Sequence, residues 1–395
     1  MLENAKPNFQ KGGKLAFLGS TFDAIETFAF VPGHTTHKGV HIRDGIDLKR
    51  TMFVVVTALI PCLLFGMWNV GYQHHLATGE MATLMDNFLY GLAKVLPIVV
   101  VAYGVGLGIE FAFAQINGHQ VNEGYLVSGM LIPLILPPSI PLWMVALATA
   151  FAVIVGKEVF GGTGMNLLNP ALTARVFLFF AYPGYMSGES LASGQYVWLD
   201  AMKANTVDGF SGATVLGKVA ENTQIQDAGW SFWDYFLGTI PGSIGETSTL
   251  MILIGALMLF VTGIGSWRIM LSVFIGGAVA ALILNGAHAA LGITAESSKV
   301  SALMQIPFYY HWVIGGFAFG AVYMATDPVT ASQTQKGKWI YGLLIGFLAV
   351  LIRVFNPSYP EGMMLAILLM NVFAPLIDYY VVDANKKRRL QRAKI

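Results

Sequence analysis

Charged side chains are scarce in this chain of 395 residues, where Asp, Glu, Lys and Arg together make up only 11%. A soluble domain carries about a quarter of such residues, whereas 55% of this chain is hydrophobic and its mean hydropathy is +0.62. This composition predicts an integral membrane protein. The formal net charge of +1 excludes a globally basic protein that binds nucleic acid.

Metal ligands and nucleotide motifs are also missing. Cys62 is the single cysteine, so the chain can form no internal disulfide and cannot by itself supply a thiolate cluster for zinc or iron–sulfur. His34, His37 and His41 come close to the spacing of one helix face, but glycines in the same stretch oppose a helix, and no metal site is expected. The "GVGLG" at 104–108 has the wrong spacing for a dinucleotide fingerprint. Such centres would have to come from a partner protein.

The first 50 residues lack the plan of a cleaved secretory signal, because they are polar throughout and have only short apolar runs. We therefore interpret residues 1–52 as a retained cytoplasmic extension.

Apolar runs follow this extension along nearly the whole chain. A membrane span needs about 20 apolar residues, and several runs are short or interrupted by proline, notably in "LIPLILPPSIPLW". Ten spans are expected, at 53–70, 91–113, 125–137, 141–156, 170–185, 248–265, 268–288, 311–326, 339–355 and 362–381.

Basic residues near the span ends predict the orientation. "HIRDGIDLKR" precedes the first span and "NKKRRLQRAK" follows the last one, which places both termini in the cytoplasm and fits an even number of spans. The chain then divides into a first transmembrane half, an outer periplasmic loop, a second transmembrane half and a basic cytoplasmic tail. Their expected bounds are 53–185, 186–247, 248–382 and 383–395.

The two halves of the sequence share a faint internal similarity. Both contain a Pro-broken apolar span, a second span that ends in a basic residue near Val-Phe, an Asn-Pro and a further span. In a ten-span arrangement the two copies run in opposite directions, as in transporter-like folds built from inverted five-helix repeats with broken helices. The alternative is that proline and glycine are simply common in membrane helices. Either way, the fold class expected is an all-α polytopic membrane protein.

Ionisable residues at membrane depth cost roughly 2.5–3.5 kcal/mol each on insertion scales, so each invites a functional hypothesis. Asp327 is the most suggestive, because Pro328 breaks the helix there and frees carbonyls that could join the carboxylate around a hard cation such as Na⁺. A solvated span end, or a pairing with Lys336, is the alternative. Asp378 lies near the basic tail, where we expect an interfacial ion pair. The other ionisable residues of this kind are Glu110, Arg175 and Arg353.

Two polar breaks between spans are candidate ligand sites. Residues 156–177, "GKEVFGGTGMNLLNPALTARVF", combine glycines, two asparagines and a proline; glycines let the backbone approach a large flat ligand, and the following helix start favours anions. Asn122, Glu123 and Gly124 form a polar turn that could face a ligand at headgroup level. An ordinary tight turn is the alternative for both.

A third polar stretch, "DGFSGATVLGKVAEN" at 208–222, lies in the outer loop. It predicts an open turn before a helix over 215–221, so that the Thr214 hydroxyl lies near the positive helix end, where a phosphate is stabilised. Most such turns hold no ligand, and the residues alone leave that alternative open.

Many segments nevertheless resemble those of one family in order and spacing. The sequence is similar to the B subunits of the sodium-translocating NADH:quinone oxidoreductases, and the likeness covers nearly the whole chain. The segments that carry it include "HIRDGIDLKRTM", "VNEGY", "DGFSGATVL", "IPGSIGETSTL" and "NPSYPEGMMLAIL". The related D subunit of the Rnf complex is the runner-up, although that family generally lacks the long polar N-terminal extension.

The resemblance implies a flavoprotein subunit of a bacterial inner-membrane pump of six subunits, which passes electrons from NADH to ubiquinone and exports Na⁺. It implies covalent FMN on Thr214 within the motif Ser211, Gly212, Ala213, and a noncovalent riboflavin. Of the five partner subunits, one carries a second covalent FMN and one carries the sites for NADH, FAD and iron–sulfur. Activity is expected only within the complex.

The resemblance also assigns candidate residues on the cytoplasmic side. Glu123 and Gly124 correspond to the quinone region, and Glu123, Asp327 and Asp378 correspond to the cation pathway. A different class of protein, a secondary transporter with inverted repeats and no redox role, is the further alternative; it would be colourless when purified.

Overall fold

The computed structural model describes most of the chain beyond residue 47. The described residues are 7, 9, 19, 22, 36, 38–42, 48–117, 124–186, 194–208, 210, 212–221, 223–292, 300–356 and 361–393. Among the expected site residues, Asn122, Glu123 and Ser211 lie outside this set, as does most of the 1–52 extension.

Among the described residues, six helices are long and apolar enough to cross a membrane. They are α3 (Leu48–Thr78), α4 (Leu84–Asn117), α6 (Leu142–Ile154, continued by the 3-10 turn η2, Glu158–Phe160), α12 (Trp267–Leu291), α16 (Gln335–Phe355) and α17 (Met363–Ala393). Each lies on an expected span. The expectation of an all-α polytopic membrane protein is confirmed.

The other four expected spans are short or broken helices. They are α5 (Tyr125–Leu134), α7 (Pro170–Ala181), α11 (Thr249–Val261), and a run of α14 (Phe308–Val313), α15 (Phe317–Phe319) and the π-helix η5 (Gly320–Met324). Local chemistry explains the interruptions. Asn169 caps α7 through its side chain with Pro170 in the first turn, and Gly315 has a φ of 64° between α14 and α15.

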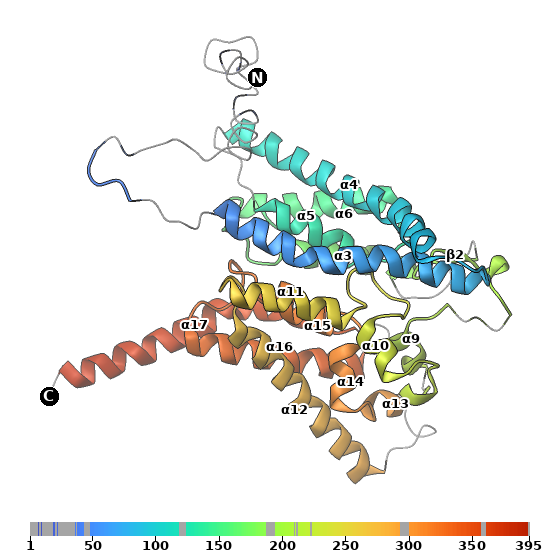
Figure 1. Ribbon diagram of the computed structural model, residues 1–395. Coiled ribbons are helices and arrows are strands. Elements are labelled where there is room, and N and C mark those ends of the chain that lie inside the picture. Colours follow the sequence, from blue (N-terminus) through green and yellow to red (C-terminus); the bar gives the residue numbers. More distant parts are fainter. Residues whose placement is uncertain are drawn as a thin grey trace.

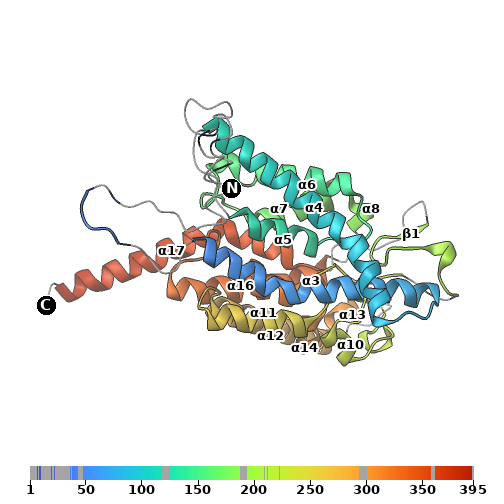
Figure 2. The same ribbon diagram turned by 45° about the horizontal axis from the view of Figure 1, so that its top comes forward.

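Two pairs of packed helices occur at matching positions of the two halves, whereas the packing of α3 on α4 has no such counterpart between α11 and α12. In the first half α4 packs on α6 and α6 on α7; in the second half α12 packs on α16 and α16 on α17. Figures 1 and 2 show α3 to α7 gathered in one part of the molecule and α11 to α17 in the other. The packing of these helix pairs agrees with the internal similarity between the two halves of the sequence.

The first helices of the two halves, α3 and α11, meet in antiparallel orientation. Gly255, in the middle of α11, lies against the carbonyl of Ala58 near the start of α3. Asn69, further along α3, donates its Nδ2 to the carbonyl of Ile240, 3.0 Å away and before the start of α11. The direction of these two helices is that of an inverted repeat.

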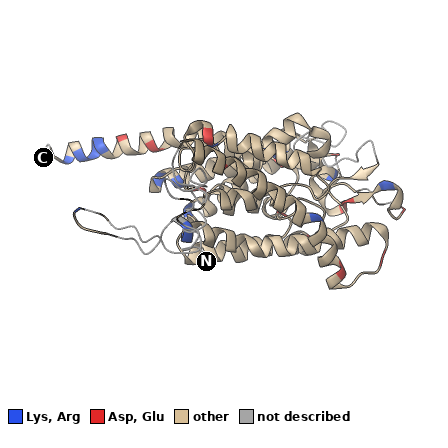
Figure 3. Ribbon diagram, turned by 90° about the horizontal axis from the view of Figure 1, so that it is seen from above, with Lys and Arg blue, Asp and Glu red and all other residues tan. Residues whose placement is uncertain are grey.

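Short elements cover one end of the bundle. They are α8 (Pro183–Met186), the antiparallel pair β1 (Gln195–Tyr196) and β2 (Ala201–Met202), η3 (Lys203–Asn205), α9 (Val215–Ala220), η4 (Ile225–Asp227), α10 (Phe232–Leu237) and α13 (Ser301–Met304). We call this the loop end. The opposite, tail end holds the start of α3 and the C-terminal part of α17, which protrudes and carries a series of basic residues (Figures 1 and 3).

Candidate functional site

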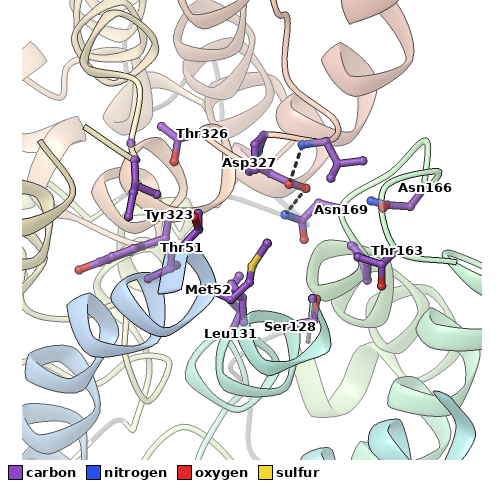
Figure 4. A pocket seen from close by; sticks show the side chains of 18 of the residues that line it. Thr51, Met52, Ser128, Leu131, Thr163, Asn166, Asn169, Tyr323, Thr326 and Asp327 are labelled. Atoms are coloured by element: carbon purple, nitrogen blue, oxygen red, sulfur yellow. Dashed lines mark hydrogen bonds between the residues drawn. The ribbon is translucent and has the colours of Figure 1, made fainter. Parts of the chain in front are cut away.

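A cavity of about 90 Å³ lies at the tail end, where the two halves meet. Figure 4 shows its side chains converging from α3, α5, the 156–177 segment and the turn after η5. The 156–177 segment, Gly124 and the break at Pro328 therefore share one site. Its polar lining comprises Thr51, Ser128, Lys157, Thr163, Asn166, Asn169, Tyr323, Thr326 and Asp327.

Asp327 joins the two halves across this cavity. Its carboxylate accepts from the Val329 amide at 3.1 Å and the Thr330 hydroxyl at 3.0 Å, both in the turn that Pro328 imposes. It also accepts from Asn169 Nδ2 at 3.4 Å, a contact between residues 158 positions apart (Figure 4). These partners occupy only part of the carboxylate's capacity of about four acceptor sites, so the group can still accept from a ligand.

The first-half side of the cavity is set by the cap of α7. Asn169 Oδ1 accepts from the amides of Ala171 and Leu172 at 3.0 and 3.3 Å, which fixes the side chain so that its Nδ2 is directed at Asp327. Gly124 faces Thr163 across the same region, and a Cβ on Gly124 would lie 2.5 Å from the Thr163 methyl. A side chain at position 124 would therefore require the Thr163 side chain to move.

A buried ion pair lies beside the cavity. The Lys157 ammonium, a lining residue with 4% of its side chain exposed, pairs with Glu110 of α4, whose side chain is 5% exposed. The Lys157 ammonium also lies 6.0 Å from the centre of the Tyr125 ring. The sequence analysis identified Glu110 as energetically costly at membrane depth, and the pairing with Lys157 offsets part of that cost.

Asp378 has a separate set of partners. Its carboxylate accepts from the Ser332 hydroxyl at 2.7 Å, the Gln333 amide at 2.7 Å, and the Thr334 amide and hydroxyl at 3.0 and 2.6 Å. These four donors precede α16, so Asp378 of α17 fixes the start of α16. Among the described residues they hold its carboxylate, and the interfacial ion pair expected from the sequence is not formed.

Thr214 lies at the loop end as the N-cap of α9. Its Oγ1 accepts from the Gly217 amide at 3.2 Å, and the side chain is partly exposed. Gly212 precedes it with a φ of 64°, and a Cβ there would lie 2.2 Å from the Tyr196 ring, so only glycine fits. The helix expected after Thr214 is present.

Packing holds α9 in place. Val215, Leu216 and Val219 are buried, while Lys218 donates to the Ala228 carbonyl at 3.1 Å and lies 4.2 Å from the centre of the Trp230 ring. Partial burial lowers the pKa of the Lys218 ammonium. The hydroxyl of Thr214 is thus presented on a short helix whose other face is anchored to the bundle.

A buried charge network lies beneath α9. Arg175 of α7 donates from Nη1 to both carboxylate oxygens of Glu246 at 2.8 and 2.9 Å, and from Nη2 to Glu361. Glu246 also touches the backbone of the broken span, since a Cβ on Gly316 would lie 2.5 Å from its Oε1. The network therefore joins α7, the chain before α11 and the chain before α17.

Arg353, fully buried on α16, completes this network. Its Nη1 donates to the His311 carbonyl at 3.1 Å and its Nη2 to the Ile314 carbonyl at 3.2 Å and the Glu361 carbonyl at 3.4 Å. The carbonyls of His311 and Ile314 are left without a helical partner because α14 ends at Val313, and such carbonyls need partners inside a membrane. A Cβ on Gly315 would lie 2.7 Å from Leu216 Cδ1, which places α9 directly against this break.

The structure brings some predicted residues together and separates others. Gly124 and Asp327 line one cavity, whereas Thr214 lies at the opposite end and Asp378 has its own partners. The sequence did not single out Glu246, Glu361 or His311. The two glutamates lie in "IPGSIGETSTL" and "NPSYPEGMMLAIL". Each is an ionisable residue inside a break rich in glycine and proline, and this pattern could have identified both as candidate buried charges.

The fold and the site define a class: a polytopic helical membrane protein of two packed halves, with broken helices that line a polar cavity between them. Residues 35–387 match the model of the NQR2, RnfD, RnfE family. The chain belongs to this family.

Relatives cover nearly the full length. The chain is 49% identical to the B subunit of the Na(+)-translocating NADH-quinone reductase of Ectopseudomonas mendocina, over 99% of this chain and 98% of that protein. It is 47% identical to the protein of the same name from Chromohalobacter salexigens, over 99% and 95%. It is 46% identical to that of Azotobacter vinelandii, over 99% and 98%.

Proposed function

We propose that this chain is the B subunit of a sodium-translocating NADH–quinone reductase and works within a complex of several subunits. The observation that carries the proposal is the full-length similarity to proteins of that name, at 45 to 49% identity. The single cysteine and the lack of a dinucleotide fingerprint in the sequence support it as well, because iron–sulfur chemistry and NADH oxidation then belong to other subunits. The chain would contribute to quinone reduction.

FMN bound through a phosphoester to Thr214 is the first element of the proposal. The surroundings of Thr214 fit this group: the hydroxyl is partly exposed, it lies where the amides of α9 point, and Gly212 leaves no side chain beside it. Backbone amides at a helix start stabilise a phosphate. When bound, FMN would supply electron transfer; this chain's residues would fix its position through the anchored α9.

The tail-end cavity is the proposed region of cation passage and quinone reduction. Asp327 retains acceptor capacity there, and oxygen ligands suit a hard cation such as Na⁺. Gly124 lies in the same lining, next to Glu123, so the two remain the proposed quinone region for ubiquinone. Asp378, with its four donors already in place, would act on the cation pathway by holding the start of α16.

Riboflavin, the second proposed flavin, does not fit this cavity as it stands. The volume of about 90 Å³ is below the range of about 300–1,000 Å³ typical of small-molecule pockets. We therefore propose riboflavin as a cofactor of the chain without assigning it to this cavity.

The proposed location is the bacterial inner membrane, with both termini cytoplasmic and the 186–247 loop periplasmic. The basic series on the protruding part of α17 supports this orientation. Five partner subunits are proposed, among them a second covalent-FMN subunit and one that binds NADH, FAD and iron–sulfur. The Rnf D subunit is the alternative, because the same family model includes it.

Replacing Thr214 with alanine tests the flavin assignment in the assembled complex. We expect the denatured subunit to lose its flavin fluorescence under ultraviolet light, and the peptide 204–218 to lose the added mass of FMN. Thr206→Ala, in the same peptide, is the matched control and should keep both signals. A fluorescent Thr214→Ala band would remove the assignment, and a wild-type subunit without flavin would favour a transporter with no redox role.

A further inference from the structure

A groove of about 340 Å³ separates α16 from α17 at the tail end. The apolar part of its lining comprises Ile340, Ile377, Tyr380, Val381 and Ala384, and the polar part comprises Lys336, Asn385 and Arg388. The side chains of Ile340, Tyr380 and both cations are exposed. One groove thus presents an apolar floor and two cations to the surroundings of the bundle.

The groove lies at the level where the membrane ends. Asp378 fixes the register of α17 against the start of α16, so the first turn of α16, with Lys336, is level with the middle of α17. The 31 residues of α17 span about 46 Å at 1.5 Å per residue, against a hydrocarbon core of about 30 Å. The C-terminal part of α17, which includes Arg388, extends beyond the other helices at the tail end (Figure 1). The difference between the two lengths places this part in the headgroup region and beyond.

The two cations of the groove have no acidic partner in the described part of the chain. Lys387, by contrast, lies next to Arg388 on α17 and pairs with Asp383 at 2.8 Å. Lys336 and Arg388 are thus available to an external anion. An anion held by them would lie beside an apolar floor that runs towards the hydrocarbon core.

We propose that this groove binds one anionic phospholipid, with its phosphate between Lys336 and Arg388 and an acyl chain along Ile340 and Ile377. Basic pockets between membrane helices at the cytoplasmic surface are recognised sites for acidic lipid headgroups. The aromatic ring of Tyr380 suits the same level, since tyrosine is favoured at the membrane interface. The paired charge and apolar surface select a lipid over a soluble anion.

The test uses the full-length chain, purified in mild detergent with the subunits that remain bound to it. Tetraoleoyl cardiolipin should raise its melting temperature in a saturable titration, whereas dioleoyl phosphatidylcholine should not. In the double variant Lys336→Gln/Arg388→Gln, the apparent Kd for cardiolipin should rise about 30-fold. Each cation near the surface contributes about 1 kcal/mol to binding, and a loss of about 1.4 kcal/mol corresponds to a tenfold weaker Kd. Ile340→Gln, which keeps both charges, should also weaken cardiolipin binding.

Lys386→Gln/Arg389→Gln is the matched control, because it also removes two positive charges, both from positions of α17 outside the groove. Its Kd for cardiolipin should stay near the wild-type value. Equal weakening in both double variants would replace the proposal with a general surface-charge effect. Competition by millimolar inorganic phosphate would show an anion site without lipid. Loss of another subunit from Lys336→Gln/Arg388→Gln, with cardiolipin binding unchanged, would assign the groove to a protein partner.

Discussion

At the scale of single residues, Arg175 carries a buried charge that two glutamates share. Its side chain is 3% exposed and contacts Glu246 and Glu361. A sequence can mark such an arginine as expensive at membrane depth, as it did here. It cannot name the partners, because Glu246 and Glu361 are separated from Arg175 by 71 and 186 positions.

Arg175→Ala would leave Glu246 buried, and Glu361 partly buried, without the cation that they share. Breaking a buried pair in this way costs about 3–5 kcal/mol, so we expect a clearly lower melting temperature and less of the protein in the membrane. Arg175→Lys should be intermediate, because it keeps the charge but loses the two-pronged contact. Lys203→Ala, at an exposed position of the 186–247 segment, is the control. Similar melting temperatures for Arg175→Ala and this control would contradict the expectation.

At the scale of elements, the turn before α9 illustrates what a local pattern can and cannot provide. The residues 211–214 predict a turn and a helix start, and α9 begins at Val215. The pattern does not show that Gly212 packs against Tyr196 of β1. That contact links the turn to a strand that lies before it in the loop.

Gly212→Ala should displace this turn, since its Cβ would meet the Tyr196 ring and the φ of 64° disfavours alanine. We expect lower incorporation of FMN at Thr214, measured as fluorescence per denatured subunit. Gly229→Ala is a matched control, because Gly229 has a φ of 96° but open space around it. Gly212→Ala/Tyr196→Ala should recover part of the fluorescence; equal incorporation in both glycine variants would exclude the packing effect.

The broken span is a second case at this scale. Its apolar sequence predicts one span over 311–326, and the structure divides it into α14, α15 and a π-helix. The division depends on Arg353, which binds the carbonyls that the break leaves free. The partner is a residue of α16, so periodicity within the span could not reveal it.

At the scale of the whole molecule, the two halves meet around Asp327 and Asn169. Both residues follow from local signals, a helix broken by proline and an Asn-Pro cap. Their contact across the cavity comes only from the packing of the second half on the first. The cavity therefore depends on the relative position of the halves.

Asp327→Asn should weaken the response to Na⁺ if the carboxylate contributes to the cation pathway. We expect the Na⁺ concentration for half-maximal quinone reduction in the assembled complex to rise about tenfold, which corresponds to about 1.4 kcal/mol. Asp383→Asn, which removes a carboxylate from the protruding part of α17, is the control. An unchanged Na⁺ response in Asp327→Asn would take Asp327 out of the pathway.

The sequence alone determined the helical membrane class, the positions of the spans and the helix start at Thr214, because hydropathy, proline and capping act over a few residues. The tertiary structure decided which buried charges pair, how α3 and α11 cross, and that the breaks of the two halves surround one cavity. These features depend on contacts between distant positions, which are 47 apart for Glu110 and Lys157, 71 for Arg175 and Glu246, and 158 for Asn169 and Asp327. No local pattern encodes such contacts, since they form only when separate helices and the two halves pack together.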